Sequence, residues 1–277
     1  MPELPEAETM ARDLQRRTPG LLIADLLAAY PPIIASDGDL FREILVGQTI
    51  VQVGRLGKLV RFDLSSGAAF FAHLKMTGQF ALGPWPGSLE GHWPPHARVA
   101  FLLKGVGSTT TLFYKDVRKF GRLRAFAADK VQAYVDGLAL GPDPLTVDPQ
   151  IFHKRLSAQR GRLKGVLLDQ KIVAGFGNIY ADESLFAAGL SPLRSAASLS
   201  EKETSLLLTE ARRIMNESIK LRGSTVDNYQ GLEGGGSYQD KHQAYGKGGK
   251  PCPKCGQPFL KVAVLGRSTV YCPVCQN

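Results

Sequence analysis

Four cysteines at the end of the chain constrain its fold more than any other feature. They form two Cys-x-x-Cys pairs, Cys252 with Cys255 and Cys272 with Cys275, and the rest of the 277-residue sequence contains no cysteine. Each pair can present two thiolates from one tight turn, and two pairs complete the tetrahedron that zinc prefers. A disulfide framework is the alternative, but it is unusual in a large chain without other cysteines. We therefore expect one structural zinc ion in a C-terminal finger.

The chain also carries a marked excess of positive charge. Its 34 Lys and Arg residues against 25 Asp and Glu residues give a net charge of +9 and a pI of about 9.4. Basic side chains gather in residues 115–124 and 154–164, which favours a polyanionic partner, with nucleic acid ahead of a membrane surface. A generally basic soluble protein is the alternative. Since no apolar run reaches the ~20 residues of a membrane span and no signal peptide is recognisable, we expect a cytoplasmic protein.

The N-terminus offers a possible nucleophile. Pro2 follows the initiator methionine, and Glu3 and Glu6 stand close behind it. Once Met1 is removed, Pro2 has a free secondary amine, and α-amino groups have a pKa near ~8, so part of the population is neutral at pH 7. A neutral amine can form a Schiff base, for which a nearby carboxylate can move protons. The alternative is a mobile terminus ahead of a helix that begins at Pro5.

Hydrophobic periodicity divides the chain into a β-rich part, a helical part, a Gly-rich loop and the finger. The alternation of apolar residues and the turn punctuation within 21–126 favour a β-sandwich or barrel. Glycine-rich residues 222–249 are expected to form a linker or functional loop. The expected helices cover residues 5–17, 148–156, 161–170, 178–188 and 200–221, and the expected strands cover residues 59–64, 68–82, 99–103 and 110–114, with a hairpin at 259–271.

Five further positions could carry chemistry, although each has an ordinary structural explanation. Lys58, at the start of a strand, could bind phosphate or be a solvated surface residue. Met76, before a Thr-Gly turn, could be exposed or buried in the core. Residues 116–121 place a phenylalanine among cations, which suits the gap left by a flipped base, or form a charged hairpin. Asn178 is expected to be an N-cap at a phosphate-binding or merely well-capped helix. Arg267 could hold a phosphate from the finger or serve solubility.

Together these motifs resemble the formamidopyrimidine-DNA glycosylase family. The resemblance runs from Pro2 to Gln276, with matching stretches at 2–6, 73–78, 116–121 and 175–184 and in the finger. It implies an α+β multidomain protein that clamps damaged or abasic double-stranded DNA and acts as a monomer. Its expected domains are a catalytic β-sandwich with an N-terminal helix at 1–130, a helix–two-turns–helix domain at 131–228, and a linker with a β-hairpin zinc finger at 229–277. The resemblance implies no catalytic metal or organic cofactor.

The resemblance also implies a bifunctional DNA glycosylase and abasic-site lyase of base excision repair. In this interpretation Pro2 attacks the sugar carbon that bears 8-oxoguanine or a formamidopyrimidine, Glu3 transfers protons, and Glu6 supports both. Strand cleavage by β- and δ-elimination follows. Lys58 and Arg267 complete the catalytic site. The remaining implied contacts are His73, Met76, Arg118, Phe120 and Asn178 on DNA, and Thr225, Val226, Asp227, Asn228 and Tyr229 on the damaged base.

The sequence departs from the usual family pattern at two motifs. Val117 replaces a proline beside Arg118, which is expected to loosen that loop, and Lys247 replaces an arginine before the finger, which keeps a charge but loses a bidentate donor. Two other functions fit parts of the sequence. An endonuclease VIII-like glycosylase for oxidised pyrimidines shares the architecture, although Leu4 favours the purine enzyme. A non-catalytic zinc-finger DNA-binding protein would leave the Pro2–Glu3 start unexplained.

Overall fold

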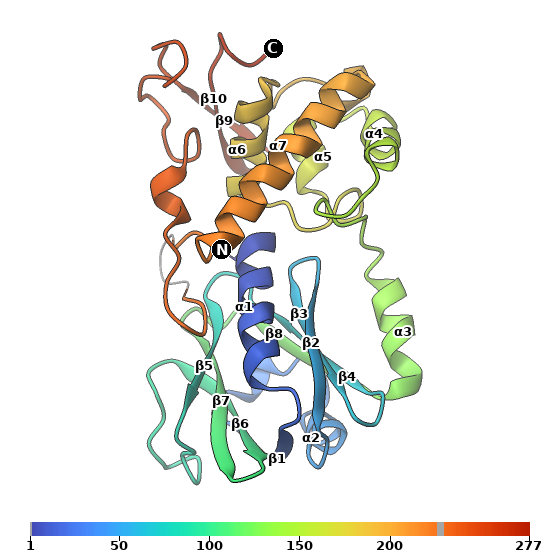
Figure 1. The fold of residues 1–277 in the computed structure, drawn as a ribbon, viewed down its shortest axis with the longest axis vertical. Helices are drawn as coiled ribbons and strands as arrows, with labels where there is room; N and C mark the ends of the chain where they lie inside the picture. Colours follow the sequence, from blue (N-terminus) through green and yellow to red (C-terminus); the bar gives the residue numbers. More distant parts are fainter. Residues whose placement is uncertain (1, 226–229) are drawn as a thin grey trace. The chain divides into compact units, whose positions relative to one another are not determined.

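The computed structural model describes residues 2–225 and 230–277 and divides the chain into two compact units (Figure 1). The first unit comprises residues 1–138 and 222–236, and the second comprises residues 139–221 and 237–277. The segment 222–236 therefore belongs to the β-rich unit, although it follows the longest helix of the second unit in the chain. We describe each unit separately.

The first unit is a sandwich of two antiparallel four-stranded sheets with a helix at its N-terminus. The strand orders are β1-β6-β7-β5 and β2-β3-β4-β8. Phe62 and Phe70 of one sheet stack at 4.0 Å, and Phe70 also stacks with Phe101 of the other at 5.6 Å, so both sheets share one core. The elements are α1 (Leu4–Arg17), β1 (Leu22–Ala28), η1 (Pro31–Ile33), α2 (Gly38–Leu45), β2 (Ile50–Leu56), β3 (Leu59–Leu64), β4 (Ala69–His73), β5 (Gly78–Gly83), β6 (Ala97–Gly105), β7 (Ser108–Asp116), β8 (Arg122–Phe126) and α3 (Ala128–Gly137).

The sequence correctly indicated the sandwich but not all of its elements. The single strand expected over 68–82 is two strands, β4 and β5, which lie in different sheets. Lys75 adopts a left-handed φ of 52° in the turn between them. The helix α2 was not anticipated. It is short, and its N-terminus is capped by Asp37, whose carboxylate accepts hydrogen bonds from Asp39 and Leu40.

Residues 83–96, for which the sequence indicated no role, cover the outer face of one sheet. Trp85 and Trp93 pack against Ala97, Ala100 and Phe113, on the side of β6 and β7 that points away from the sandwich core. Trp93 meets Phe113 edge to face, with ring centroids 6.0 Å apart. Both tryptophans of the chain therefore lie in the first unit, and their fluorescence reports on its unfolding.

The second unit combines helices with a C-terminal hairpin. Its elements are α4 (Pro149–Ser157), α5 (Leu163–Leu168), α6 (Asn178–Ala188), η2 (Ala196–Ser198), α7 (Glu201–Lys220), η3 (Tyr238–Lys241), β9 (Leu260–Val264) and β10 (Arg267–Tyr271). The central helix α6 is buried on nearly all sides and packs against α5, α7 and β10. A capping box of Ser200 and Glu203 is present at the start of α7, which begins within the expected helix 200–221. No helix in the described part of the chain is long and apolar enough to cross a membrane.

One helix has the expected bounds but a different N-cap from the sequence interpretation. Gly177 is the N-cap of α6, and Asn178 is its first helical residue. Gly177 has no side chain, so it makes no side-chain capping hydrogen bond. The side chain of Asn178 is thereby available for another purpose, since it does not cap the helix.

Candidate functional site

Two carboxylates are buried at the N-terminus of α1 and hold its start in place. Glu3 and Glu6 are 2% and 1% exposed. They form a reciprocal capping box, in which Glu6 Oε2 accepts a 2.8 Å hydrogen bond from the backbone N–H of Glu3. The other oxygen of Glu6 accepts the backbone N–H of Ser224 at 2.8 Å. Pro2, which is also buried, lies directly before this capping box.

Gly223 is required where the chain passes Glu6. Its φ is +85°, and a Cβ placed on it would lie 2.9 Å from the Glu6 side chain. A larger residue would therefore meet both backbone strain and steric conflict. The segment 222–224 and the N-terminus of α1 thus form one site, built from two parts of the sequence that are more than 200 residues apart.

Lys58 lies in a tight hairpin turn that is tied to α1. The turn consists of Gly57, with φ 59°, and Lys58, because Leu56 pairs with Leu59 across β2 and β3. Lys58 therefore precedes the strand rather than starting it. Arg55 donates from Nε to Glu8 of α1 at 2.7 Å and from Nη1 to the carbonyl of Gly57 at 2.9 Å. This chain of contacts fixes the half-buried Lys58 relative to the helix that carries Pro2 and Glu3.

His73 is a neutral histidine opposite the Lys58 hairpin. It pairs with Leu59 in the ladder between β3 and β4, and its Nδ1 accepts the backbone N–H of Lys75 at 3.1 Å. Desolvation, aided by the positive charges of Lys75 and Lys58, lowers the pKa of His73 to about 3. Because Nδ1 is an acceptor, the neutral ring carries its proton on Nε2 and can donate one hydrogen bond there.

This pKa makes the stability of the first unit depend on pH. The unfolded chain binds a proton at His73 below pH ~6.5 and the folded chain does not, so stability falls as pH drops from about 6.5 toward 3. With an allowance for partial exposure, we expect wild type to lose about 2 kcal/mol more than His73→Gln between pH 7 and pH 4. Denaturant titrations followed by tryptophan fluorescence measure the difference. Equal losses in both proteins would contradict a neutral His73.

Asp116 joins the two loops that carry the candidate DNA wedge. It is fully buried; one carboxylate oxygen accepts the hydroxyl of Thr77, and the other accepts the backbone N–H of Gly121 at 2.7 Å. The Thr77 hydroxyl in turn accepts the backbone N–H of Arg118 at 3.0 Å. Gly121 has no room for a side chain, because a Cβ would lie 1.8 Å from the Tyr114 hydroxyl.

The side chains held by these loops fit a wedge. Phe120 is 48% exposed, so its ring is accessible to a partner. The guanidinium of Arg118 lies 4.8 Å from the centre of the Phe120 ring. Met76, in the other loop, is half-buried. The sequence predicted a looser loop because Val117 replaces a proline, but the Asp116 hydrogen bonds connect the loop at both of its ends.

Replacing Asp116 by asparagine tests this arrangement. The amide can accept only through one atom, so one buried partner, Thr77 or Gly121, loses its acceptor, which costs about 1–3 kcal/mol. We expect unfolding of the first unit to be easier by about 2 kcal/mol and the wedge loops to lose order. Tryptophan fluorescence and hydrogen exchange at 74–78 and 117–121 measure the two effects. The exposed Asp129→Asn is the control, and an unchanged exchange pattern in Asp116→Asn would contradict the role.

The flanks of the expected damaged-base loop are ordered. Thr225 Oγ1 accepts the backbone N–H of Gly236 at 2.8 Å, which brings the two ends of the segment together. Gln230 donates its backbone N–H to Gln79 Oε1 of β5 at 3.0 Å. The other residues assigned to this loop, Val226, Asp227, Asn228 and Tyr229, lie outside the described residues.

In the second unit, Asn178 stands at the open start of α6. Gly175, with φ 100°, and Gly177 precede it. Its Oδ1 is buried and has no hydrogen-bond partner among the residues that the structure describes. The positive end of the helix dipole and the side-chain amide N–H groups of Asn178 together suit an anionic group.

A buried ion pair fixes the hairpin of Arg267 on the same helix. Lys164 of α5 and Asp182 of α6 are both essentially inaccessible and lie 2.7 Å apart. Lys164 Nζ also donates to the carbonyl of Ser268 at 2.8 Å, and Asp182 accepts the backbone N–H of Val270 at 3.2 Å. The exposed Arg267, the first residue of β10, is therefore held in the same unit as Asn178. The sequence analysis missed this pair, because neither residue lies in a recognisable ligand pattern.

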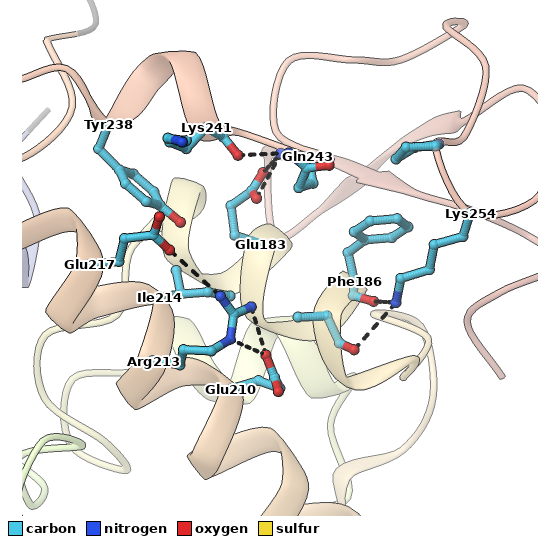
Figure 2. A pocket seen from close by; sticks show the side chains of 12 residues that line it. Glu183, Phe186, Glu210, Arg213, Ile214, Glu217, Tyr238, Lys241, Gln243 and Lys254 are labelled. Carbon is cyan, nitrogen blue, oxygen red and sulfur yellow. Dashed lines mark hydrogen bonds and ion pairs between the residues drawn. The ribbon is translucent and has the colours of Figure 1, made fainter. Parts of the chain in front are cut away.

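The neighbouring Glu183 anchors the segment that leads to the finger. Its carboxylate accepts the backbone N–H groups of Gln243, Ala244 and Tyr245 at 2.7–3.1 Å. Figure 2 shows the contact with Gln243. Lys254 donates to the carbonyl of Phe186 at 3.0 Å, near the C-terminal end of α6. Both contacts border a cavity of about 480 Å³ between α6, α7 and the finger. These contacts fix the turn that carries Lys247, so the backbone that bears this positive charge is held in place.

The four cysteine sulfurs have the geometry of a zinc site. All four Sγ atoms lie within 4.8 Å of one another, with Cys252 and Cys275 3.9 Å apart and Cys255 and Cys272 3.5 Å apart. A tetrahedral site with Zn–S bonds of about 2.3 Å requires sulfur separations of about 3.8 Å. The thiolates fit the ion, and four protein ligands leave no position for a substrate, so the site is structural.

Comparisons with known proteins agree with this geometry. Residues 1–123 match the formamidopyrimidine-DNA glycosylase N-terminal domain, residues 140–230 match the formamidopyrimidine-DNA glycosylase H2TH domain, and residues 249–277 match a zinc finger found in FPG and IleRS. The chain belongs to the formamidopyrimidine-DNA glycosylase family. It is therefore a DNA glycosylase of base excision repair with a structural zinc finger, as the sequence indicated.

Individual relatives match over their whole length. The formamidopyrimidine-DNA glycosylase of Geobacillus kaustophilus is 40% identical, and that of Lactococcus lactis subsp. lactis 36%, with 100% of each chain covered in both comparisons. Among solved structures, Lactococcus lactis Fpg in complex with DNA containing N7-benzyl-Fapy-dG has a TM-score of 0.89 at 34% identity and 99% coverage of both chains. Its complex with abasic-site DNA has a TM-score of 0.88 at the same identity and coverage.

Proposed function

We propose that the protein removes oxidised purines, 8-oxoguanine and formamidopyrimidines, from duplex DNA and then cleaves the strand, with Pro2 as nucleophile. The observation that carries this proposal is the buried start of α1, where Glu3 and Glu6 are held by hydrogen bonds directly behind Pro2. A terminus fixed in this way is suited to precise attack on a sugar carbon. A frayed terminus, the alternative raised by the sequence, would not have buried carboxylates.

The proposed reaction conserves atoms and charge. The unprotonated nitrogen of processed Pro2 attacks C1′, the bond to the base breaks, and the base leaves with a proton. The sugar ring opens with proton transfer by Glu3, which gives an iminium at C1′. The positive nitrogen acidifies C2′, so loss of a proton there expels the 3′ phosphate, and a second elimination expels the 5′ phosphate. Hydrolysis of the iminium then releases Pro2. Glu6 supports these steps through its hydrogen bond to Glu3.

The remaining residues are proposed to hold DNA around this centre. Lys58, Asn178 and Arg267 bind phosphates, Asn178 through the N–H donors of its side-chain amide. Met76, Arg118 and Phe120 fill the gap left by the flipped nucleotide. The neutral ring of His73 donates one hydrogen bond to DNA from Nε2. Thr225, Val226, Asp227, Asn228 and Tyr229 are proposed to contact the damaged base.

The proposal extends to the partner and the place of action. The similar Lactococcus lactis structures are complexes with DNA that contains an abasic site or Fapy-dG. We propose the same class of partner, double-stranded DNA with an oxidised base or abasic site, bound by a monomer. We also propose three domains, with the catalytic sandwich at 1–130, the helical domain at 131–228 and the finger with its linker at 229–277. The site of action is the cytoplasm, on the bacterial nucleoid.

Excision from matched duplexes tests the substrate class. With 8-oxoguanine and thymine glycol in the same sequence context, we expect faster release of 8-oxoguanine, and borohydride should trap the protein covalently on either an 8-oxoguanine or an abasic duplex. Preference for thymine glycol would instead support the endonuclease VIII-like function. Absence of a trapped complex with correctly processed protein would support a non-catalytic DNA-binding protein.

A further inference from the structure

An ion pair in the first unit has no role in the chemistry proposed above. Asp13 of α1 is 1% exposed, and its Oδ2 lies 2.5 Å from Nη2 of Arg222. Its other oxygen lies 2.6 Å from Nη2 of Arg16. The two arginine partners hold Asp13 in place, because an almost completely buried carboxylate without a partner would lower the free energy of unfolding.

Arg222 itself has an unfavourable backbone conformation. Its φ is +66°, in the left-handed region that residues with a Cβ avoid. The ion pair compensates for this strain. Glu233 reinforces the contact, since it lies 3.5 Å from Arg222 and 3.3 and 3.2 Å from Arg16 and Arg17. These outer contacts are more exposed than the Asp13 pair and are more strongly screened by solvent.

The strained residue leads directly to the catalytic carboxylates. Gly223 and Ser224 follow Arg222, and the Ser224 N–H binds Glu6, which in turn binds the N–H of Glu3. Asp13 lies seven residues after Glu6, two helical turns along the same face of α1. The turn 222–224 is thus attached to α1 at both Asp13 and Glu6, and displacement of Arg222 would move the donor to Glu6.

We propose that Arg222 is a positioning residue for the reaction, which docks the 222–224 turn on Asp13 and so fixes Glu6 and Glu3 behind Pro2. This inference rests on the proposed function, because the positioned groups are those assigned to the chemistry. It predicts that breaking the ion pair slows the chemical step while DNA still binds.

Arg222→Gly is the most informative variant. Glycine adopts φ +66° without strain, so the substitution removes the side chain and leaves the turn accessible. In single-turnover experiments on an 8-oxoguanine duplex, we expect at least a tenfold slower excision and borohydride-trapping rate and a DNA Kd within twofold of wild type. The melting temperature should fall by no more than a few degrees, because Arg16 still pairs with Asp13 and glycine relieves the backbone strain. Arg222→Lys keeps the charge and should recover part of the rate. Arg42→Gln, which breaks the 2.5 Å pair with Asp25 elsewhere in the unit, should behave as wild type.

The outcomes separate this inference from the function on which it rests. If wild type excises 8-oxoguanine and Arg222→Gly does so equally fast, the positioning role is wrong and the proposed function stands. Parallel losses of rate, affinity and melting temperature would indicate a purely structural role and also overturn it. If Arg222→Gly does not fold, the isosteric Asp13→Asn is tested instead. We again expect slower excision with a DNA Kd close to that of wild type. A wild type without excision or trapping overturns both proposals.

Discussion

A short N-terminal extension that leaves Pro2 inside the chain is expected to abolish covalent trapping on DNA. The extension turns the secondary amine into an amide, whose nitrogen is not nucleophilic, so no iminium can form. The same holds for any chain that retains Met1. We expect excision and strand cleavage to fall at least about a thousandfold, as is typical when a catalytic nucleophile is lost. Borohydride trapping and product analysis on 8-oxoguanine and abasic duplexes measure the loss.

The control for this prediction uses the same protein. An extension with a protease site directly before Pro2 can be cleaved to restore the free amine, and trapping should return to the level of the processed chain. Glu3→Gln, which keeps the nucleophile but removes a proton-transfer group, should reduce the rate by about 10²–10⁴. Trapping by the uncleaved extended chain at the processed rate would show that another amine carries the reaction.

Local features of the structure could be predicted from the sequence because they depend on residues that are close together in the chain. The capping box of Ser200 and Glu203 joins residues three apart, and each cysteine pair fits into one turn. The helix after Pro2 was likewise predicted, and α1 begins one residue earlier than expected. In each case the chemistry and the spacing of a few adjacent residues decide the structure.

The contacts that position these groups could not be predicted, because they join distant segments. Asp116 binds a hydroxyl 39 residues away, and Glu6 binds an amide 218 residues away. A buried carboxylate of this kind has no local signature, and its partner is often a backbone N–H, which every residue except proline offers. The N-cap of α6 was misassigned for a related reason. Asn178 is the better N-cap by propensity, but the chain places Gly177 there and leaves the asparagine side chain for another contact.

Removal of one zinc ligand should have the largest effect on DNA binding. Cys272 is fully buried, and its sulfur completes the site with the three other cysteines. The apolar cluster around it is small, with Phe186, Phe259 and Val270 as its larger members, so the metal supplies most of the order. Structural zinc contributes about 10–16 kcal/mol in finger peptides. We expect Cys272→Ser to lose the ion, and the hairpin of Arg267 to lose its fixed position.

Two variants separate the contribution of the whole finger to DNA affinity from the contribution of a single charge on it. Cys272→Ser should bind an abasic-site duplex at least a hundredfold more weakly in anisotropy titrations, with zinc content measured in parallel, because every contact made by the finger is lost together. Arg267→Ala keeps the metal and the hairpin, so it should weaken binding only about tenfold and lower the slope of log K against log salt by about one. The first unit does not contain the finger, and its unfolding by tryptophan fluorescence should be unchanged in both variants. Retention of wild-type affinity by zinc-free Cys272→Ser would exclude the finger from the DNA interface, and the basic surfaces of the remaining chain would then have to supply the binding energy.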